Sequence, residues 1–407
     1  MSSVGRIVVF TTHPVHYMAA LFARIARSSP RVVEVWFGQD APTAGKRKDG
    51  FGIDYEWKIP LRDGYPSRVL RNRAPAPNPS TFFGTLNLGM PALLVRERPL
   101  IIIIVGYAYL QSLLTLLYAR CLRIPVVMFG EFSMAQHKKR SRLRRLLKRV
   151  VLKALGRQLS AALTIGYDGA RFARTVLCLP ASRVFIGPYS CDSDVFVPAT
   201  SEDRQMVREM VRADWGVKTD DLAVLYVGKL YSGKRPMDLL EAISRLHITC
   251  RRKAVAVFVG DGEQSNALRD RAESLGVRAV FCGFVDYGEL PKILSAGDAL
   301  FCTSRRETWG MVVHEAMSVG LPIIGSSSVP SIAELVLPGV SGFVVDDGDF
   351  DAAARAIAIL EGDSDLARRM GQNARRTAVV RGQSAATEAW LSAIEFTLFE
   401  RGTNGRT

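Results

Sequence analysis

The sequence predicts an α/β protein with two doubly wound parallel sheets joined by a short linker. The first observation is length, because 407 residues is the usual size of two globular domains. The second is alternation, since short apolar segments and longer helical segments follow one another over residues 6–186 and again over residues 223–345. The third is the stretch 187–198, in which glycine and proline interrupt this pattern. We therefore expect domains at 1–190 and 191–382, followed by a terminal segment, 383–407.

The first series contains six predicted strands. Each is a run of aliphatic or aromatic residues bounded by turn-forming residues, at 6–10, 32–37, 101–105, 125–129, 161–165 and 183–186. A helix ending near Arg27 connects the first two strands. Residues 38–98 are rich in Gly, Pro and Arg, so we expect long loops around weak elements there. Loops of this kind often carry ligand recognition.

The second series also contains six predicted strands, at 223–227, 254–259, 278–282, 299–302, 321–325 and 342–345. Helices between successive strands make both sheets parallel, so the residues that follow the strands meet at one edge of each sheet. An amphipathic helix over residues 383–400 ends the pattern. No Gly-x-Gly-x-x-Gly follows the first strand, which argues against a dinucleotide-dependent dehydrogenase.

The composition describes a globular protein of a reducing compartment. Hydrophobic residues make up 48% and charged residues 23% of the chain, enough to fill two cores. Six cysteines are scattered without a Cys-x-x-Cys pair, and no signal peptide is evident, so we expect a cytoplasmic protein. Pro99 to Ala119 carries no charge, but Gly106 and the polar residues after it divide the segment. We predict a buried strand and its crossover helix there rather than a membrane span.

The net charge of +15 is concentrated in one segment. Residues 138–157 hold ten cations and no acid, and without them the balance is 44 basic against 39 acidic residues, or +5. Apolar residues recur at helical spacing within the segment, namely Leu143, Leu146, Leu147, Val150 and Ala154. We predict an amphipathic helix that binds an anionic membrane surface through Arg142, Arg145, Lys148 and Arg149. The alternative is a crossover helix that packs this stripe on the sheet. No aromatic residues interleave the charges, so nucleic acid is not expected.

The stretch 299–322 carries the main candidate site. A strand, Ala299 to Cys302, delivers a polar loop, and we expect a helix from Trp309 to Val319 with Thr308 as its N-cap. The free amides at such a helix start, those of Gly310, Met311 and Val312, can hold an anion. Glu315 lies five residues further on, roughly 7.5 Å along the helix, about the step from a diphosphate to the ribose of one nucleotide. The alternative is that Glu307 and Glu315 are merely solvated.

A cationic loop follows the first strand of the second series. Gly228-Lys229-Leu230-Tyr231-Ser232-Gly233-Lys234 nearly satisfies the P-loop pattern Gly-x4-Gly-Lys-Ser/Thr, but Arg235 stands where a hydroxyl must bind Mg²⁺. A P-loop nucleotidase is therefore a weak interpretation. The alternative without function is a pair of solvated lysines at a helix start.

The segments Glu307-Thr308-Trp309-Gly310 and Glu315-Ala316-Met317-Ser318-Val319-Gly320-Leu321-Pro322 resemble the Glu-x7-Glu signature of glycosyltransferase family 4. The resemblance implies the GT-B fold, in which two Rossmann-like domains face each other across a cleft, with the terminal helix packing back on the N-terminal domain. It also implies a retaining transferase that takes a nucleotide-diphosphate sugar as donor and needs no metal or other cofactor.

The resemblance assigns roles residue by residue. Lys229 and Lys234 stand where the family clamps the donor diphosphate, although arginine is usual at the first position and lysine lacks its bidentate fork. Glu315 would bind the ribose and Glu307 the donor sugar. The Gly-Asp-Gly segment with Asp261 and Gly262, and the strand end with Phe284 and Val285, would line the nucleoside pocket; plain turn and core packing is the alternative.

The N-terminal half resembles a subset of the family that begins with Thr-His-Pro-x-x-Tyr, here Thr12 to Tyr17, and that carries Gly130-Glu131 after a central strand. His13 and Glu131 are therefore candidate catalytic residues, and which of them accepts the nucleophile's proton stays open. His137, His247 and His314 are expected to be structural. Asp192 and Asp194 form an Asp-x-Asp pattern that could bind a metal, but turn and capping roles fit their position better, and we predict no metal.

The sequence thus predicts a retaining glycosyltransferase whose partners are a nucleotide sugar, a lipid-linked or glycan acceptor, and an anionic membrane on the cytoplasmic side. Two alternatives remain open. A catalytically silent protein of the same fold would bind the nucleotide sugar or a membrane without turnover. A nucleotide-sugar 2-epimerase would form product without an acceptor. The sequence does not specify the base, the sugar, the acceptor or the linkage.

Overall fold

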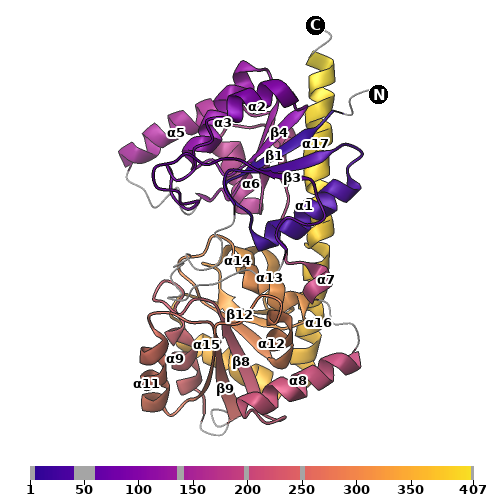
Figure 1. Cartoon of the computed structure of the whole chain (residues 1–407). Coiled ribbons are helices and arrows are strands. Elements are labelled where there is room, and N and C mark those ends of the chain that lie inside the picture. Colours follow the sequence, from indigo (N-terminus) through magenta and orange to yellow (C-terminus); the bar gives the residue numbers. More distant parts are fainter. Residues whose placement is uncertain (1–4, 41–59, 135–141, 197–200, 248–252, 405–407) are drawn as a thin grey trace. The chain divides into compact units, whose positions relative to one another are not determined.

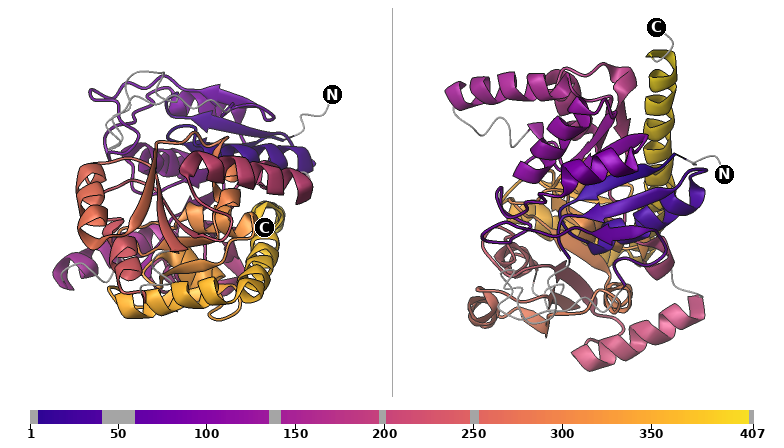
Figure 2. Two further views of the ribbon diagram at one scale, coloured as in Figure 1. Left: turned by 90° about the horizontal axis from the view of Figure 1, so that it is seen from below. Right: turned by 45° about the horizontal axis from the view of Figure 1, so that its top comes forward.

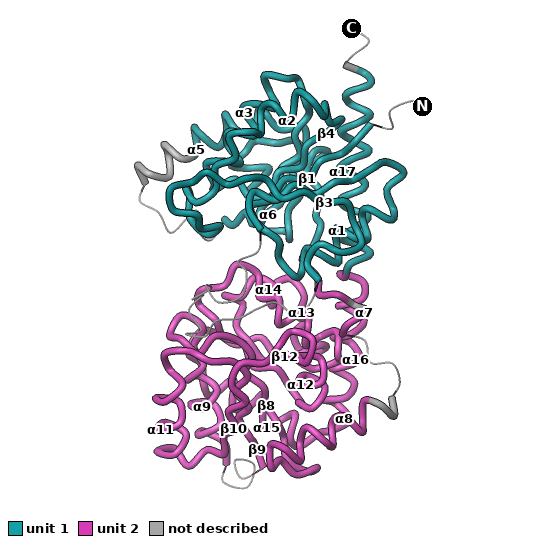
Figure 3. Tube along the Cα trace, in the orientation of Figure 1, with its two compact units in different colours: residues 1–43, 59–189, 383–407 teal, residues 44–58, 190–382 magenta. Residues whose placement is uncertain are grey.

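The computed structural model describes residues 5–40, 60–134, 142–196, 201–247 and 253–404. The described chain forms two compact units (Figure 3). Unit 1 contains the residues up to Tyr189 together with the helix that starts at Gln383, and unit 2 contains Ser190–Gly382. The terminal helix therefore belongs to the unit built from the first half of the chain.

Unit 1 is organised around a seven-stranded sheet with the order β3-β2-β1-β4-β5-β6-β7, in which all pairs are parallel. Its strands are β1 (Ile7–Thr11), β2 (Val33–Phe37), β3 (Ser67–Val69), β4 (Ile101–Val105), β5 (Val126–Gly130), β6 (Ala161–Thr164) and β7 (Val184–Ile186). The central strands are continuous apolar runs because helices cover both of their faces. Six of the seven coincide with predicted strands.

Helices cover both faces of the first sheet (Figures 1 and 2). The helical elements are α1 (His16–Ser28), α2 (Met90–Glu97), α3 (Leu110–Cys121), α5 (Arg142–Gly156), α6 (Tyr167–Thr175), the short η1 (Ala181–Arg183) and α17 (Gln383–Asn404). Helices α2, α3, α5 and α6 share one core, to which Leu94, Leu116 and Phe172 contribute. Helices α1 and α17 pack together against the other face, where Trp390 contacts Phe22 and Phe129.

Unit 2 is organised around a six-stranded parallel sheet with the order β10-β9-β8-β11-β12-β13. Its strands are β8 (Leu222–Val227), β9 (Ala254–Val259), β10 (Arg278–Gly283), β11 (Ala299–Cys302), β12 (Ile323–Ser326) and β13 (Gly342–Val345). Numbered within the unit, this is the order 3-2-1-4-5-6 of a doubly wound nucleotide-binding sheet. The fold class predicted from the sequence, two doubly wound sheets, is therefore confirmed.

The helices of unit 2 are α7 (Ser193–Phe196), α8 (Ser201–Trp215), α9 (Met237–Ser244), α11 (Ser265–Leu275), α12 (Leu290–Ala296), α13 (Met311–Ser318), α14 (Pro330–Leu335), α15 (Phe350–Gly362) and α16 (Ser364–Val380). Residues of α9, α11 and α15 share a core with alternate residues of the strands, such as Val224 and Phe258. Elsewhere, α12 packs on α8 and α13 packs on α16.

Helix α8 carries arginines at every fourth position, so all three lie on one face. Arg208 donates to the carbonyls of Ser295, Ala296 and Gly297, and Arg212 donates to the Ala296 carbonyl at 2.9 Å. Both also pair with the Asp298 carboxylate, and Arg204 donates to the Val319 carbonyl. These side chains bind carbonyl groups left without partners where α12 and α13 end.

The structure adds detail to two expectations from the sequence. Residues 38–98 contain a regular strand, β3, and a regular helix, α2, in addition to loops. In α5, the residues packed into the core are Leu152 and Leu155, whereas Val150 and Ala154 of the predicted stripe are exposed. These positions contradict only the alternative in which the whole predicted stripe packs on the sheet, because both faces of α5 offer apolar residues and spacing alone does not say which face meets the sheet. Membrane binding by α5 stays a prediction.

Within the described ranges, no helix has both the length and the apolar character needed to cross a membrane. The uncharged segment 99–119 divides into strand β4 and the first part of helix α3, as predicted. Helix α3 buries Gln111, Ser112 and Thr115.

Candidate functional site

The candidate site of unit 2 lies where the strand order reverses. Strands β8 and β11 are neighbours, but β8 continues into β9 on one side and β11 into β12 on the other. Helices and loops diverge at such a point and leave space beyond the carboxyl ends of the strands. The cationic loop follows β8, and the loop with Glu307 follows β11, so the fold brings the two predicted segments to this point.

Glycines hold the cationic loop close to the next loop of the sheet. Gly228 and Gly260 both have positive φ, 146° and 133°, and a Cβ on Gly260 would lie 2.0 Å from the Gly228 carbonyl oxygen. A Cβ on Gly262 would lie 2.4 Å from the Leu230 carbonyl oxygen. Hydrogen bonds from the Leu230 amide to the Asp261 carbonyl and from the Gln264 amide to the Leu230 carbonyl complete the contact. Only glycine fits these positions, so the backbone of the cationic loop is fixed before any ligand binds.

Lys234 and Glu307 form an ion pair across the site. The side chains are 23% and 15% exposed, so the pair is partly shielded from water. The amides of Arg305 and Arg306 both donate to the Gly233 carbonyl at 3.1 Å, which ties the loop after β11 to the cationic loop. The structure thus brings together two residues that the sequence assigned separately to the diphosphate and to the sugar.

Helix α13 begins at Met311, two residues later than predicted. Gly310 is the N-cap, with φ 97°, and a Cβ there would lie 2.7 Å from Ser331 Oγ. Thr308 is therefore not the cap, and Trp309 is buried before the helix, where its carbonyl accepts the Ser331 amide at 2.9 Å. No side chain caps the helix, so the amides of Met311 and Val312 stay available to an anion.

Glu315 is buried on α13, with 4% of its surface exposed. Burial raises the pKa of its carboxyl from 4.5 to about 8. A carboxyl group in this state is protonated at neutral pH until a ligand supplies hydrogen-bond donors. Two adjacent hydroxyl groups of a ligand could each donate a hydrogen bond to a carboxylate in this position.

A network of ionic residues beside the site was missed in the sequence. Arg235, in the left-handed region with φ 57°, donates to Asp238 at 2.8 Å and lies 3.8 Å from Asp347. Thr303 also donates to Asp238 at 2.9 Å, and burial raises the pKa of Asp238. Arg235 therefore holds the ends of β11 and β13 to the start of α9. The departure from the P-loop pattern drew attention to Arg235, but the network depends on residues distant in the sequence. Asp347 is 112 positions from Arg235, and Thr303 is 65 positions from Asp238.

The residues assigned to the nucleoside occupy the adjoining strand ends. The Asp261 carboxylate accepts the Gly262 amide at 2.7 Å and the Ser265 hydroxyl, so it stabilises the turn into α11. Phe284 and Val285 follow β10 and are half-buried. The Gly260 amide donates to the Gly283 carbonyl at 2.7 Å and joins these two strand ends.

The carboxyl edge of the first sheet has a different chemistry. The Tyr189 hydroxyl donates to Glu131 Oε1 at 2.9 Å, and Tyr17 packs on Tyr189 with ring centroids 4.8 Å apart. The His13 Nδ1 lies 2.9 Å from the Thr12 hydroxyl. Burial raises the pKa of Tyr109, and the charge of Glu131 raises it further. Tyr189 was assigned only to the linker from the sequence, whereas it is the direct partner of the candidate Glu131.

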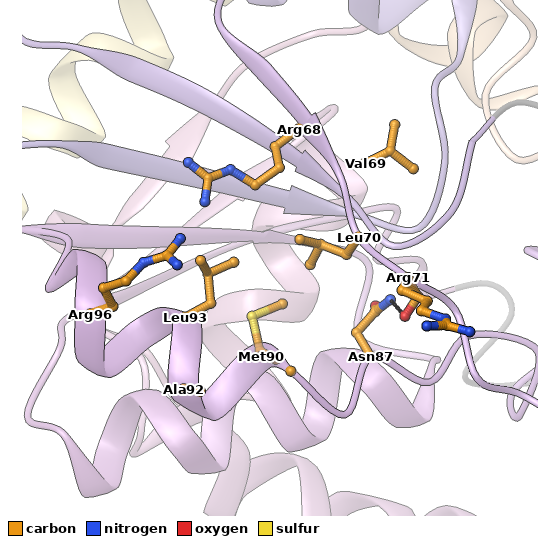
Figure 4. Close-up of a pocket in the computed structure, with 10 residues that line it drawn as sticks. Arg68, Val69, Leu70, Arg71, Asn87, Met90, Ala92, Leu93 and Arg96 are labelled. Carbon is orange, nitrogen blue, oxygen red and sulfur yellow. Dashed lines mark hydrogen bonds between the residues drawn. The ribbon is translucent and has the colours of Figure 1, made fainter.

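A cavity of about 410 Å³ opens at the edge of the first sheet, between β3 and α2 (Figure 4). Leu70, Met90 and Leu93 form its apolar part, and Arg68 and Arg96 approach it from β3 and α2. Both arginines pair with Glu97, at 3.1 and 2.9 Å, so this carboxylate offsets part of their charge. The cavity lies within the segment 38–98 that was expected to recognise a ligand.

Among the residues that the structure describes, no three His, Cys, Asp or Glu side chains gather as a metal site would require. The Asp192 carbonyl accepts the amides of Val195 and Phe196 at 3.1 Å, which starts α7. The Asp194 side chain lies outside the described residues. The metal-free prediction itself awaits experiment.

Residues 207–377, from α8 to α16, match the model of the family described as glycosyl transferases group 1. The match covers 171 of the 407 residues, so this region is similar to glycosyl transferases group 1. The matched region includes every residue that the sequence assigned to the donor, namely Lys229, Lys234, Asp261, Gly262, Phe284, Val285, Glu307, Gly310, Met311, Val312 and Glu315.

Curated relatives align over about half of the chain. Alpha-D-kanosaminyltransferase of Streptomyces kanamyceticus is 32% identical over 199 residues, 48% of this chain and 50% of the relative. N-acetyl-alpha-D-glucosaminyl L-malate synthase of Bacillus anthracis is 26% identical over 199 residues, 48% of this chain and 51% of the relative. The chain spans about half the length of the curated relatives it matches.

Solved structures match nearly the whole chain. The crystal structure of Anabaena HepE in complex with UDP covers 96% of this chain and 99% of its own, with a TM-score of 0.72 and 18% identity. WaaG, a glycosyltransferase involved in lipopolysaccharide biosynthesis, covers 95% and 99%, with a TM-score of 0.64 and 16% identity. At these identities the matches establish the fold, and it is the GT-B fold that the sequence predicted.

Proposed function

We propose that this protein is a glycosyltransferase that moves a sugar from a nucleotide-diphosphate sugar to an acceptor, with retention of the anomeric configuration. The observation that carries the proposal is one sheet edge in unit 2, within the region that matches the group 1 model, which brings together a glycine-fixed cationic loop, an uncapped helix start and the buried Glu315. The UDP complex of Anabaena HepE supports a nucleotide donor, because its fold covers this chain almost completely.

The donor diphosphate would bind Lys229, Lys234 and the amides at the start of α13. Lys234 is paired with Glu307, so a diphosphate that binds Lys234 competes with this carboxylate for the ammonium group. Release of Glu307 then leaves a carboxylate beside the leaving group, where it can accept hydroxyl groups of the donor sugar. Phosphate charge that develops on bond breaking is stabilised by fixed amides and ammonium groups, and such a site needs no metal ion.

The ribose would bind Glu315. Two ribose hydroxyls donating to the buried carboxyl favour its ionised form, so nucleotide binding should release a proton from a group whose pKa is about 8. Asp261, Gly262, Phe284 and Val285 lie at the adjoining strand ends and would surround the base. The contribution of Asp261 would be indirect, because its carboxylate accepts the Gly262 amide and so stabilises the turn beside the base.

The acceptor, a lipid-linked or glycan precursor, would bind unit 1. Glu131 and His13 stand at the carboxyl edge of the first sheet, and each is a candidate to take the proton from the attacking hydroxyl. The exposed Phe82 and Phe83, whose ring centroids lie 4.8 Å apart, offer apolar faces on the loop before α2. Relatives named for lipopolysaccharide core biosynthesis support a glycolipid acceptor.

The acceptor side would work at an anionic membrane on the cytoplasmic face. Helix α5 exposes Val150 and Val151, each 65% exposed, between the cations Arg149 and Lys153. Apolar side chains flanked by lysine and arginine suit a headgroup boundary. The predicted cations Arg142, Arg145 and Lys148 lie outside the residues whose side chains the structure describes, so Arg149 carries the structural part of this proposal. Binding to phosphatidylglycerol vesicles that falls in 0.5 M salt, and falls again in Arg149→Glu/Lys153→Glu, would support it.

Thermal stabilisation by a panel of nucleoside diphosphates and their glucose or N-acetylglucosamine esters tests the function. A ligand at 100 times its dissociation constant adds about 2.7 kcal/mol of stability. Stabilisation by one base, together with release of free sugar from its ester, is the expected result. Binding without turnover would favour a catalytically silent protein, an epimerised sugar nucleotide would favour an epimerase, and no stabilisation by any nucleotide would overturn the proposal.

A further inference from the structure

A buried polar cluster in unit 2 stands next to the proposed donor site without belonging to it. His314 is 2% exposed and precedes Glu315 on α13, with Ser318 one turn further on the same face. Unit 2 begins at Ser190 and ends at Gly382. The chain segments next to both of these boundaries reach the cluster.

The incoming segment binds the cluster through Cys191. Its amide donates to His314 Nδ1 at 3.3 Å, and its thiol sulfur lies 3.3 Å from the same nitrogen and 3.2 Å from Ser318 Oγ. The Ser318 hydroxyl donates to the His314 carbonyl at 2.7 Å. Burial raises the pKa of the Cys191 thiol to about 12, so the thiol is protonated and can donate in turn.

The outgoing segment binds the other side of the same ring. His314 Nε2 lies 3.1 Å from the Ala378 carbonyl oxygen, near the end of α16. A carbonyl only accepts, so Nε2 carries the hydrogen, and Nδ1 is then free to accept the Cys191 amide. Burial lowers the pKa of His314 to about 4, which keeps the ring in this neutral form. One imidazole therefore joins both segments to α13.

The same helix presents the proposed donor groups. Glu315 is the next residue, about 100° around the helix, and the amides of Met311 and Val312 lie one turn before His314. Tyr287 lies near both Glu315 and the cluster: burial raises the pKa of its hydroxyl, and proximity to Glu315, Cys191 and Asp192 raises it further when these groups are ionised. Its ring also packs on Phe196, with centroids 5.4 Å apart, at the end of α7.

We propose that His314 is a positioning residue: it fixes α13, and with it Glu315, between the segments by which the chain enters and leaves unit 2. Nucleotide binding and release of Cys191 from the cluster are then coupled. The part that concerns the nucleotide rests on the proposed function. Coupling is reciprocal, so a ligand that favours the fixed helix must also hold the incoming segment in place.

Three substitutions separate the two sides of the ring. His314→Asn keeps an acceptor near Nδ1 for the Cys191 amide, His314→Gln keeps a donor near Nε2 for the Ala378 carbonyl, and His314→Leu keeps neither. Met317→Leu is the matched control, because Met317 is fully buried on the same helix and has no part in the cluster. Melting temperature identifies any variant that fails to fold.

The first measurement is the affinity for UDP and the kinetics of UDP-glucose hydrolysis. We expect His314→Leu to weaken UDP binding about tenfold and to raise the donor KM more than it lowers kcat, with His314→Asn and His314→Gln between it and the wild type. A merely structural role would lower stability and active fraction without moving KM.

The second measurement is the rate at which iodoacetamide labels Cys191, followed by mass spectrometry of its peptide. Labelling should be slow in the wild type, slower with saturating UDP, and at least tenfold faster in His314→Leu and His314→Gln, which lose the acceptor for the Cys191 amide. His314→Asn and Met317→Leu should label like the wild type.

The outcomes distinguish this inference from the proposed function. If the wild type does not bind UDP or any other nucleoside diphosphate, the proposed function fails, while fast labelling of Cys191 in His314→Leu still supports the attachment of the incoming segment. If the wild type binds a nucleotide but His314→Leu binds it equally, with the same labelling of Cys191, the positioning role is wrong.

Discussion

The carboxyl edges of the two sheets differ in chemistry although the sheets share a topology. Both sheets are parallel, and both reverse their strand order beside the first strand of the unit. In unit 2 the loops at this point are short and rich in glycine, and they place cations and a helix start around a buried carboxyl group. In unit 1 the carboxyl edge instead places tyrosines near an exposed carboxylate, Glu131, which follows β5.

The difference shows that topology provides the place for a ligand and that the turn residues decide its charge. Gly228, Gly260 and Gly310 let backbone amides and carbonyls approach closely in unit 2, which favours an anion. The rings of Tyr17 and Tyr189 make the unit 1 edge largely apolar, and their hydroxyl groups can form hydrogen bonds. This combination suits a neutral ligand that carries hydroxyl groups. On this comparison, we expect donor binding to depend on unit 2 alone.

The largest effect is expected at Glu315. Glu315→Gln should weaken UDP binding by about two orders of magnitude, or about 2.7 kcal/mol, because a neutral amide replaces a carboxylate that accepts two ribose hydroxyls. Isothermal titration at pH 7 in two buffers of different ionisation enthalpy measures both affinity and proton release. The wild type should release a proton and Glu315→Gln should not; unchanged affinity would refute the ribose assignment.

The same substitution should stabilise the ligand-free protein at high pH. The folded pKa of Glu315 is about 8 against an ordinary value of 4.5, so the folded state holds more protons than the unfolded state between these values. Stability contributed by this group is present below pH 4.5 and is lost as pH rises through 8. The melting temperature of Glu315→Gln should match the wild type near pH 4.5 and exceed it above pH 8; an equal difference at every pH would contradict the assignment.

The cationic loop is expected to contribute next. Lys234→Ala and Lys229→Ala should each weaken UDP binding between tenfold and a hundredfold, since each removes a charge-assisted hydrogen bond worth about 1.5–3 kcal/mol. Uridine, which has no phosphate, should bind the variants and the wild type equally. Activity should persist in excess EDTA, and a loss that Mg²⁺ restores would return Asp192 and Asp194 to consideration.

A smaller effect of opposite sign is expected at Glu307. Because Glu307 pairs with Lys234 in the free protein, Glu307→Ala should leave this lysine available and tighten UDP binding a few-fold. Sugar transfer should nevertheless fall strongly, because the donor sugar loses its carboxylate. Weaker UDP binding in Glu307→Ala would show that the ion pair organises the site instead of competing with the ligand.

The smallest effect on the donor is expected in unit 1. Glu131→Gln and Tyr189→Phe should leave UDP affinity within about twofold of the wild type while lowering transfer to an acceptor. Hydrolysis of the donor by water serves as the control, since it needs the donor site alone. A large loss of UDP affinity in either variant would assign part of the donor site to unit 1.

The sequence predicted the strands well because each is a continuous apolar run that only a doubly covered sheet accommodates, as in Ile101–Val105. It located the loops of the proposed donor site for the same reason, since loops follow strands. The start of α13 was placed two residues early because Gly310, with its left-handed φ, ends the loop where Thr308 looked like a cap. Helix-capping preferences do not take into account the close contact with Ser331, which requires glycine at position 310.

The remaining features depend on partners that are distant in the sequence. His314 and Cys191 are 123 positions apart, Glu131 and Tyr189 are 58 apart, and Thr303 and Asp238 are 65 apart. No spacing pattern links such residues, since the packing of the units brings them together. The motifs therefore revealed the groups that would meet the ligand, whereas the residues that hold those groups in position needed the structure.

The three arginines of α8 bear on any redesign of this chain's charge. Their side chains bind the carbonyl groups at the ends of two neighbouring helices, through Arg204, Arg208 and Arg212. Part of the +15 net charge therefore stabilises the fold and does not serve to attract a partner. Lysine could not replace Arg212, because one ammonium group cannot reach the carbonyls and the Asp298 carboxylate at once. A variant of lower isoelectric point, made for solubility, should lose cations from α5 and keep those of α8.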